Sequence, residues 1–97
     1  MDLGLSNRTA FVAGASKGLG RATAHELAQE GCNVALCSRD GDRIRTAAEA
    51  IRDDTGAEVL PLVCDVTDAE QVESAIAQTA NTFGSLHVLV TNAGGPP

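Results

Sequence analysis

Three glycines stand close together in the run Gly14-Ala15-Ser16-Lys17-Gly18-Leu19-Gly20. The run follows a short apolar segment, residues 9–13, and precedes a segment in which apolar residues recur at helical spacing. Glycines at a strand-to-helix turn leave backbone N–H groups open to a phosphate, and the positive end of the helix dipole adds attraction. The GxxxGxG run therefore predicts a site for a dinucleotide pyrophosphate, with a plain structural turn as the alternative.

Short β-branched segments alternate with helical ones along the rest of the chain. We expect strands at 9–13, 33–38, 58–64 and 86–91, with Pro61 marking an edge strand. The first helix should end near Gly31, the second near Gly56, and the third should follow a capping box at Thr67-Asp68-Ala69-Glu70. The expected buried faces are Leu19, Ala22, Thr23 and Leu27; then Ile44, Ala47, Ala48 and Ile51; then Val72, Ala75, Ile76, Thr79 and Phe83.

This alternation is typical of βαβ units and predicts an α/β fold with a parallel sheet. Residues 88–90 are apolar at every position, which predicts a strand covered on both faces with a neighbour on each side. The four expected strands cannot supply that second neighbour. We therefore expect 1–97 to form the first half of a larger domain, with residues 1–7 as a loose tail.

Composition narrows the function classes. The 97 residues carry 13 acidic against 7 basic side chains, for a net charge of -6, which argues against nucleic-acid partners. No apolar run approaches the roughly 20 residues of a membrane span. The N-terminus lacks the pattern of a signal peptide, so we expect a cytoplasmic protein without membrane partners.

The cysteines and histidines predict no metal site. Cys32, Cys37 and Cys64 show no metal-ligand spacing, so we expect buried thiols in a reducing compartment. His87 is expected to be a half-buried strand residue, and His25 to face solvent.

Three motifs together carry a family resemblance. The glycine run, Asp65-Val66 after the third strand and Asn92-Ala93-Gly94 after the fourth resemble the short-chain dehydrogenase/reductase family, in order, from about residue 6 to 95. Ala13 stands where that family usually has Thr, and Thr91 where it often has Asn. The resemblance implies a Rossmann-type doubly wound parallel sheet, here its first β-α-β-α-β-α-β half with strand order 3-2-1-4.

The resemblance also implies a set of cofactor-binding residues. Asp65 would bond the adenine amino group beside Val66, Asn92 would stabilise the sheet, and Ala93 and Gly94 would line the ribose near the nicotinamide. Asp65 as a simple helix-capping acid and Asn-Ala-Gly as a plain turn are the alternatives. The implied loop residues are Gly14, Ser16, Lys17, Gly18, Leu19 and Gly20.

The residues at the tip of the second strand indicate whether the site prefers NAD or NADP. NAD enzymes place an acid there, which accepts from the ribose 2′-hydroxyl and repels a 2′-phosphate. The tip here is Cys37-Ser38-Arg39, where Ser38 can donate and Arg39 can supply a guanidinium fork. Lys17 adds a second cation. We expect NADP(H), with NAD(H) less favoured and a solvated Arg39 as the alternative, since Asp40 and Asp42 follow closely.

The implied chemistry is hydride transfer, which the family performs with a Ser, a Tyr and a Lys. This chain has no tyrosine, and its only lysine is Lys17, so we assign it no catalytic residue. We expect the cofactor-binding half of an NADPH-dependent reductase acting on a small carbonyl substrate, resembling 3-oxoacyl-carrier-protein reductases, and homo-oligomeric as a whole protein. The alternatives are an NADP(H)-binding half-module without catalysis and a non-binding remnant.

Overall fold

Strands and helices alternate through the whole described chain, as the sequence predicts. The computed structural model describes residues 7–14 and 18–91, and of the predicted tail only Asn7 lies among them, where its N–H donates to the Gly31 carbonyl. The elements are β1 (Thr9–Ala13), α1 (Gly18–Gln29), β2 (Asn33–Ser38), α2 (Gly41–Thr55), β3 (Val59–Val63), α3 (Ala69–Phe83) and β4 (Val88–Thr91).

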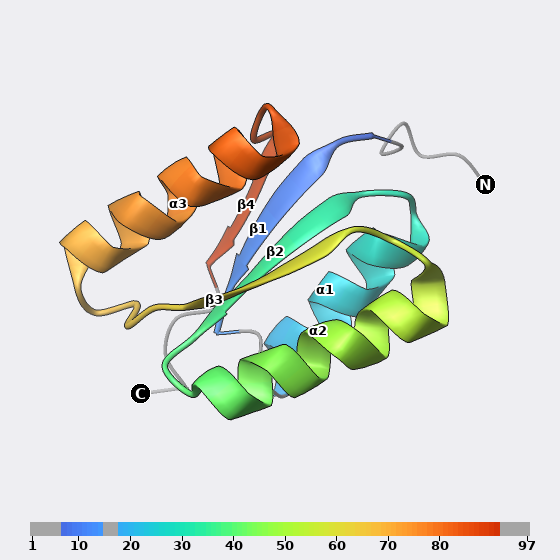
Figure 1. Cartoon of the computed structure of the whole chain (residues 1–97), viewed down its shortest axis with the longest axis horizontal. Coiled ribbons are helices and arrows are strands. Elements are labelled where there is room, and N and C mark those ends of the chain that lie inside the picture. The colour runs from blue at the N-terminus through green and yellow to red at the C-terminus, as the bar shows by residue number, and fades with distance from the viewer. Residues whose placement is uncertain (1–6, 15–17, 92–97) are drawn as a thin grey trace.

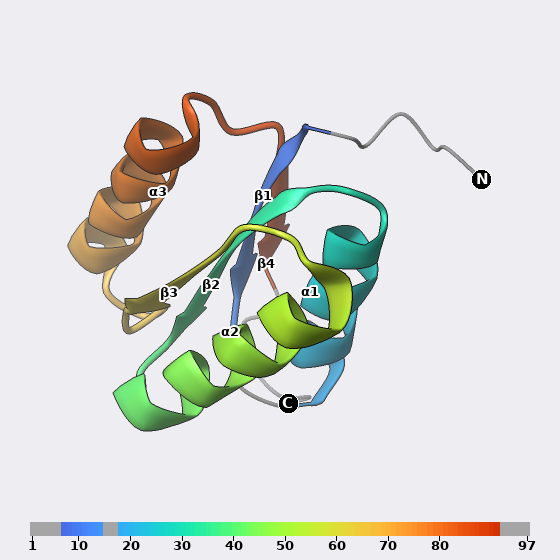
Figure 2. The ribbon, with the colours of Figure 1, turned by 45° about the vertical axis from the view of Figure 1, so that its right-hand side comes forward.

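All the strands pair in parallel, in the order β3-β2-β1-β4. Helices α1 and α2 cover one face of the sheet and α3 covers the other (Figures 1 and 2). This is a Rossmann-like α/β sheet with the predicted strand order. Pro61 lies in β3 at one edge, as the sequence indicates.

Side chains that alternate along the central strands supply two cores, because neighbouring residues of a strand point to opposite faces. Val12 of β1 packs into the core beneath α1 and α2, whereas Phe11 packs into the core beneath α3. Both side chains are fully buried. The face of α2 is confirmed residue by residue as Ile44, Ala47, Ala48 and Ile51.

The predicted face of α1 is wrong. The residues that α1 buries are Gly20, Ala24 and Ala28, whereas Leu19 is 71% exposed and Ala22 is exposed as well. The row of smallest side chains lies against the sheet, which lets the helix axis come close to the strands. Of the predicted face, Leu27 does pack against the core.

The third helix begins one residue later than the capping box predicts. Asp68, not Thr67, is the N-cap, and its Oδ1 accepts from the N–H groups of Glu70 and Gln71 at 3.0 and 3.3 Å. A carboxylate accepts these bonds at least as well as a threonine hydroxyl does. The predicted face is half right: Ala75 and Thr79 are buried, and Val72, Ile76 and Phe83 pack against the core while partly exposed.

Strand β4 is less covered than the sequence predicts. In the described part of the chain it pairs with β1 alone, and Leu89 is 53% exposed. The predicted half-buried place of His87 is also wrong, because His87 is exposed and precedes β4. Its Nδ1 accepts from the Thr9 N–H at 3.0 Å, which ties the start of β1 to the approach to β4.

Candidate cofactor site

The carboxyl ends of three strands meet at one edge of the sheet. The Gly14 N–H donates to the Cys37 carbonyl at 2.8 Å, which fixes the end of β1 beside the end of β2. The Cys64 N–H donates to the Ser38 carbonyl at 2.9 Å, which does the same for β3. The carboxyl edge of an open parallel sheet is where such folds bind their ligands.

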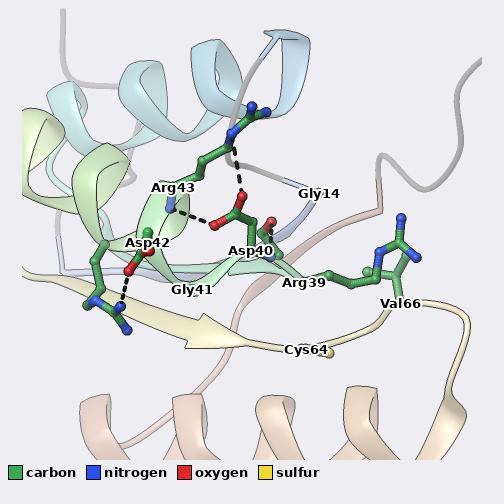
Figure 3. Close-up of a pocket in the computed structure, with 10 residues that line it drawn as sticks. Gly14, Arg39, Asp40, Gly41, Asp42, Arg43, Cys64 and Val66 are labelled. Carbon is green, nitrogen blue, oxygen red and sulfur yellow. Dashed lines mark hydrogen bonds and ion pairs between the residues drawn. The ribbon is translucent and has the colours of Figure 1, made fainter.

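This edge holds an open hollow of about 700 Å³, which is a common size for a small-molecule or cofactor site. Figure 3 shows it between the start of α2 and the ends of β2 and β3. It is lined by Gly14, Ser38, Arg39, Asp40, Gly41, Asp42, Arg43, Arg45, Cys64 and Val66.

Two glycines of the predicted loop have backbone angles that favour glycine. Gly14 and Gly18 have φ of 69° and 65°, a conformation that costs any residue with a Cβ. An added Cβ at Gly18 would meet no heavy atom within 4 Å, so its space is open and the constraint is the backbone angle. Ser16 and Lys17, which lie between them, are outside the described residues.

Ser38 is the last residue of β2, and its hydroxyl accepts one hydrogen bond from the backbone. The residue is 8% exposed, and its Oγ accepts from the Asp40 N–H at 3.2 Å. Because this bond uses an acceptor site, the hydroxyl proton remains able to donate. Ser38 therefore suits a ligand with oxygen acceptors, such as a ribose or a phosphate.

The acids beyond Ser38 each pair with an arginine. Asp40 Oδ2 lies 3.4 Å from Arg43 Nε, and Asp42 Oδ1 lies 2.6 Å from Arg45 Nη2. Within the described ranges, no carboxylate pairs with Arg39. Figure 3 shows the Arg39 side chain extending from the strand end towards Val66. Asp40 and Asp42 are thus each compensated by an arginine, whereas Arg39 forms no ion pair among the described residues and its charge acts on Asp65.

Asp65 follows β3 and has a structural role of its own. Its Oδ1 accepts from the backbone N–H and the hydroxyl of Thr67, at 2.9 and 2.7 Å. Its N–H donates to Gln71 Oε1 at 2.8 Å. The two bonds from Thr67, and then the charge of Arg39, hold the pKa of this carboxyl below its ordinary value. No bond to Oδ2 comes from the described residues, so a ligand can still reach it.

Of the remaining predicted site residues, two lie in α1 and three are outside the described part of the chain. Leu19 lies exposed in the first turn of α1 and Gly20 is buried in the same turn. Asn92, Ala93 and Gly94 lie outside the described residues.

The three cysteines are buried, as the sequence predicts. Burial, followed by the contact with Cys64, raises the pKa of the Cys37 thiol far above its ordinary value. Desolvation likewise raises the pKa of Cys32, with Glu30 adding to it.

Between residues 7 and 91, the described groups include no cluster that could hold a metal ion. No described helix is long and apolar enough to cross a membrane.

Six residues that line the hollow were not among the predicted cofactor-binding residues: Asp40, Gly41, Asp42, Arg43, Arg45 and Cys64. Of these, Asp40 and Asp42 were considered from sequence only as acids close to Arg39. Their signal was present, because Asp40–Arg43 and Asp42–Arg45 both have the i,i+3 spacing of facing side chains on a helix. The site as described offers a hydroxyl, a guanidinium and helix N-termini. Groups of these kinds can bind a phosphate.

Comparison with known proteins agrees with the fold. The sequence profile of the family described as short chain dehydrogenase matches residues 8–97. The peroxisomal 2,4-dienoyl-CoA reductase of Danio rerio is 35% identical over 91 residues, which are 94% of this chain and 30% of that protein.

Two solved structures are similar in fold and in sequence. L-sorbose reductase from Gluconobacter frateurii, complexed with NADPH and L-sorbose, has a TM-score of 0.94 at 35% identity, over 100% of this chain and 37% of that one. The F189W actinorhodin polyketide ketoreductase with NADPH has a TM-score of 0.86 at 34% identity, over 99% of this chain and 36% of that one. The chain thus spans about a third of the length of these proteins.

Proposed function

Because this chain belongs to the short-chain dehydrogenase/reductase family, we propose that it supplies the NADP(H)-binding part of an oxidoreductase that reduces a carbonyl compound. The observation that carries the cofactor choice is the state of charge at the tip of β2. Arg39 has no carboxylate partner among the described residues, while Asp40 and Asp42 each have an arginine partner. A 2′-phosphate would meet the Arg39 guanidinium there, with Asp40 and Asp42 each paired to an arginine.

The residues fit the cofactor by their own chemistry. Gly14 and Gly18 have the backbone angles of a phosphate-binding turn, and Ser38 retains a hydroxyl proton to donate. Asp65 Oδ2 would accept from the adenine amino group, and Val66 would pack beside the ring. When bound, NADPH would supply the hydride. The relatives crystallised with NADPH support this choice.

The proposed roles of the other loop residues follow from the family resemblance. Lys17 would add a second cation beside the 2′-phosphate, and Ser16, Leu19 and Gly20 would complete the loop around the pyrophosphate. Asn92 would hold the sheet, while Ala93 and Gly94 would lie along the ribose next to the nicotinamide.

The substrate we propose is a small carbonyl compound, with a 3-oxoacyl thioester as the first to test. The relatives act on different compounds by their names, among them an acyl-CoA, a sugar and a polyketide. This chain contains no tyrosine, so a tyrosine acid would have to come from sequence outside residues 1–97. We accordingly propose that 1–97 is the N-terminal part of a longer Rossmann domain in a cytoplasmic homo-oligomer, although one relative is peroxisomal by name.

A substitution at Arg39 tests the cofactor choice. Arg39→Ala should raise the dissociation constant for NADPH by about tenfold or more and leave that for NADH within about twofold, because the charge-assisted bond is made only to the 2′-phosphate. Titration of cofactor fluorescence measures both constants. Equal losses for the two cofactors would refute the NADP assignment.

A second candidate is NADP(H) binding without catalysis, which the absence of tyrosine in this chain favours. Loss of NADPH absorbance with a 3-oxoacyl thioester, measured on the purified protein, separates the two. Turnover supports the reductase. Tight NADPH binding with no turnover across a panel of ketones and thioesters supports the binding module.

A further inference from the structure

Asp40 places a carboxylate two residues beyond Ser38, close to where a 2′-phosphate would bind. Such a carboxylate should oppose the phosphate, because like charges at short range repel. We propose that Arg43, through its pair with Asp40, sets the preference of this site for a 2′-phosphate over a free 2′-hydroxyl. The proposal rests on the NADP(H) function argued above, and it makes Arg43 a positioning residue that acts through Asp40.

Both oxygens of Asp40 are engaged by the same residue. Oδ1 accepts from the Arg43 backbone N–H at 3.0 Å, as the N-cap of α2, and Oδ2 faces Arg43 Nε at 3.4 Å. The backbone of Asp40 is anchored too, because its N–H donates to Ser38 Oγ. The carboxylate is therefore fixed next to the hydroxyl that would donate to the phosphate.

Removal of the Arg43 side chain should leave this carboxylate in place and uncompensated. The backbone N–H of residue 43 remains after substitution, so the cap bond to Oδ1 persists. Asp40 would then act on the ligand as NAD-selecting acids do, against a phosphate and not against a hydroxyl. Because the pair is half exposed to water, we expect roughly a three- to tenfold effect.

The chain offers a matched control in the neighbouring pair. Arg45 also lines the hollow and also pairs with an aspartate, Asp42, at i,i+3. The Asp42 side chain is 94% exposed, so water screens it well. Its N–H makes no bond to the strand tip among the hydrogen bonds of the described residues. Arg45→Ala removes the same charge from the same helix turn and should change the preference by less than about twofold.

Two ligands isolate the effect: adenosine 2′,5′-bisphosphate and adenosine 5′-monophosphate, which differ only in the 2′-phosphate. Their dissociation constants are measured by calorimetry at low salt for the protein that carries this chain. In Arg43→Ala the bisphosphate should weaken about three- to tenfold and the monophosphate by less than about twofold. In the double variant Asp40→Asn with Arg43→Ala, the ratio of the two dissociation constants should return to that of the unmodified protein. The reason is that asparagine still caps the helix but carries no charge.

Each outcome bears on one proposal or on both. If the unmodified protein binds the bisphosphate no better than the monophosphate, the NADP(H) function fails, and the role of Arg43 fails with it. If that preference exists but Arg43→Ala equals Arg45→Ala, only the role of Arg43 is overturned. If Arg43→Ala still weakens bisphosphate binding when residue 40 is Asn, the role of Arg43 through Asp40 is also overturned, because Arg43 would then contact the phosphate directly. Arg43→Gln, which keeps most of the side-chain volume, should repeat the Arg43→Ala result.

Discussion

At the scale of single residues, Asp65 and Ser38 each use part of a polar side chain for structure and leave part of it for a ligand. Asp65 gives Oδ1 to Thr67 and keeps Oδ2 open, and Ser38 accepts from Asp40 while its proton stays available. Asp65 does not cap α3, because Asp68 does, and its bonds to Thr67 leave Oδ2 open for the adenine contact that the family resemblance implies. A hydrogen-bonded carboxylate is also held in one orientation, which lowers the entropy cost of binding.

Asp65→Asn should change how stability depends on pH. The pKa of this carboxyl is lowered in the folded protein from its ordinary 3.8, so the stability it contributes is present above that value and is lost as pH falls through the folded pKa. The difference in free energy of unfolding between the unmodified protein and the variant should be largest at about pH 6 and should shrink towards about pH 3.

Urea unfolding at both pH values measures this difference. Thr67→Ala removes one of the two bonds to Oδ1 and keeps the other, so it should give a smaller change of the same sign. A difference that stays constant with pH would show that the ionised carboxylate of Asp65 is not its source.

At the scale of elements, α1 and α2 lie on the same face of the sheet but pack differently. α2 buries two isoleucines and two alanines, whereas α1 buries one glycine and two alanines. The hydrophobic pattern identifies the first kind of face, because large apolar residues mark it. It misses the second kind, because a close helix-to-sheet contact selects small side chains whatever their hydrophobicity.

The correction to α1 can be tested with two alanines of one helix. Ala24→Leu should destabilise the protein by about 1–3 kcal/mol, because the buried site beside the sheet has no room for three more carbons. Ala22→Leu, on the exposed side, should stay within about 0.5 kcal/mol. Thermal or urea unfolding of both variants provides the measurement. If Ala22→Leu destabilised the protein more than Ala24→Leu, the buried face of α1 would be the one predicted from sequence.

At the scale of the whole molecule, the sheet has two unlike edges. The β3 edge carries Pro61, which has no N–H to offer a neighbouring strand. The β4 edge is a run of apolar residues with Leu89 more than half exposed, paired on one side alone in the described chain. An uncharged, unpaired edge of this kind attracts another strand.

A polypeptide of these 97 residues should therefore associate as its concentration rises. Light scattering after size-exclusion chromatography measures the mass in solution. Leu89→Lys should reduce the association, because an edge lysine discourages strand pairing. A monodisperse monomer at high concentration would contradict the picture of β4 as an open, adhesive edge.

The sequence by itself determined the order of strands and helices, the face of α2, the edge position of β3 and the family. Each depends on local pattern: spacing of apolar residues, proline and glycine at fixed places, and three short motifs. The structure alone decided which residues of α1 face the sheet and which residue caps α3. These outcomes depend on how closely elements approach and on which side-chain rotamers then meet, and neither distance nor rotamer is written in the spacing of residues along a chain.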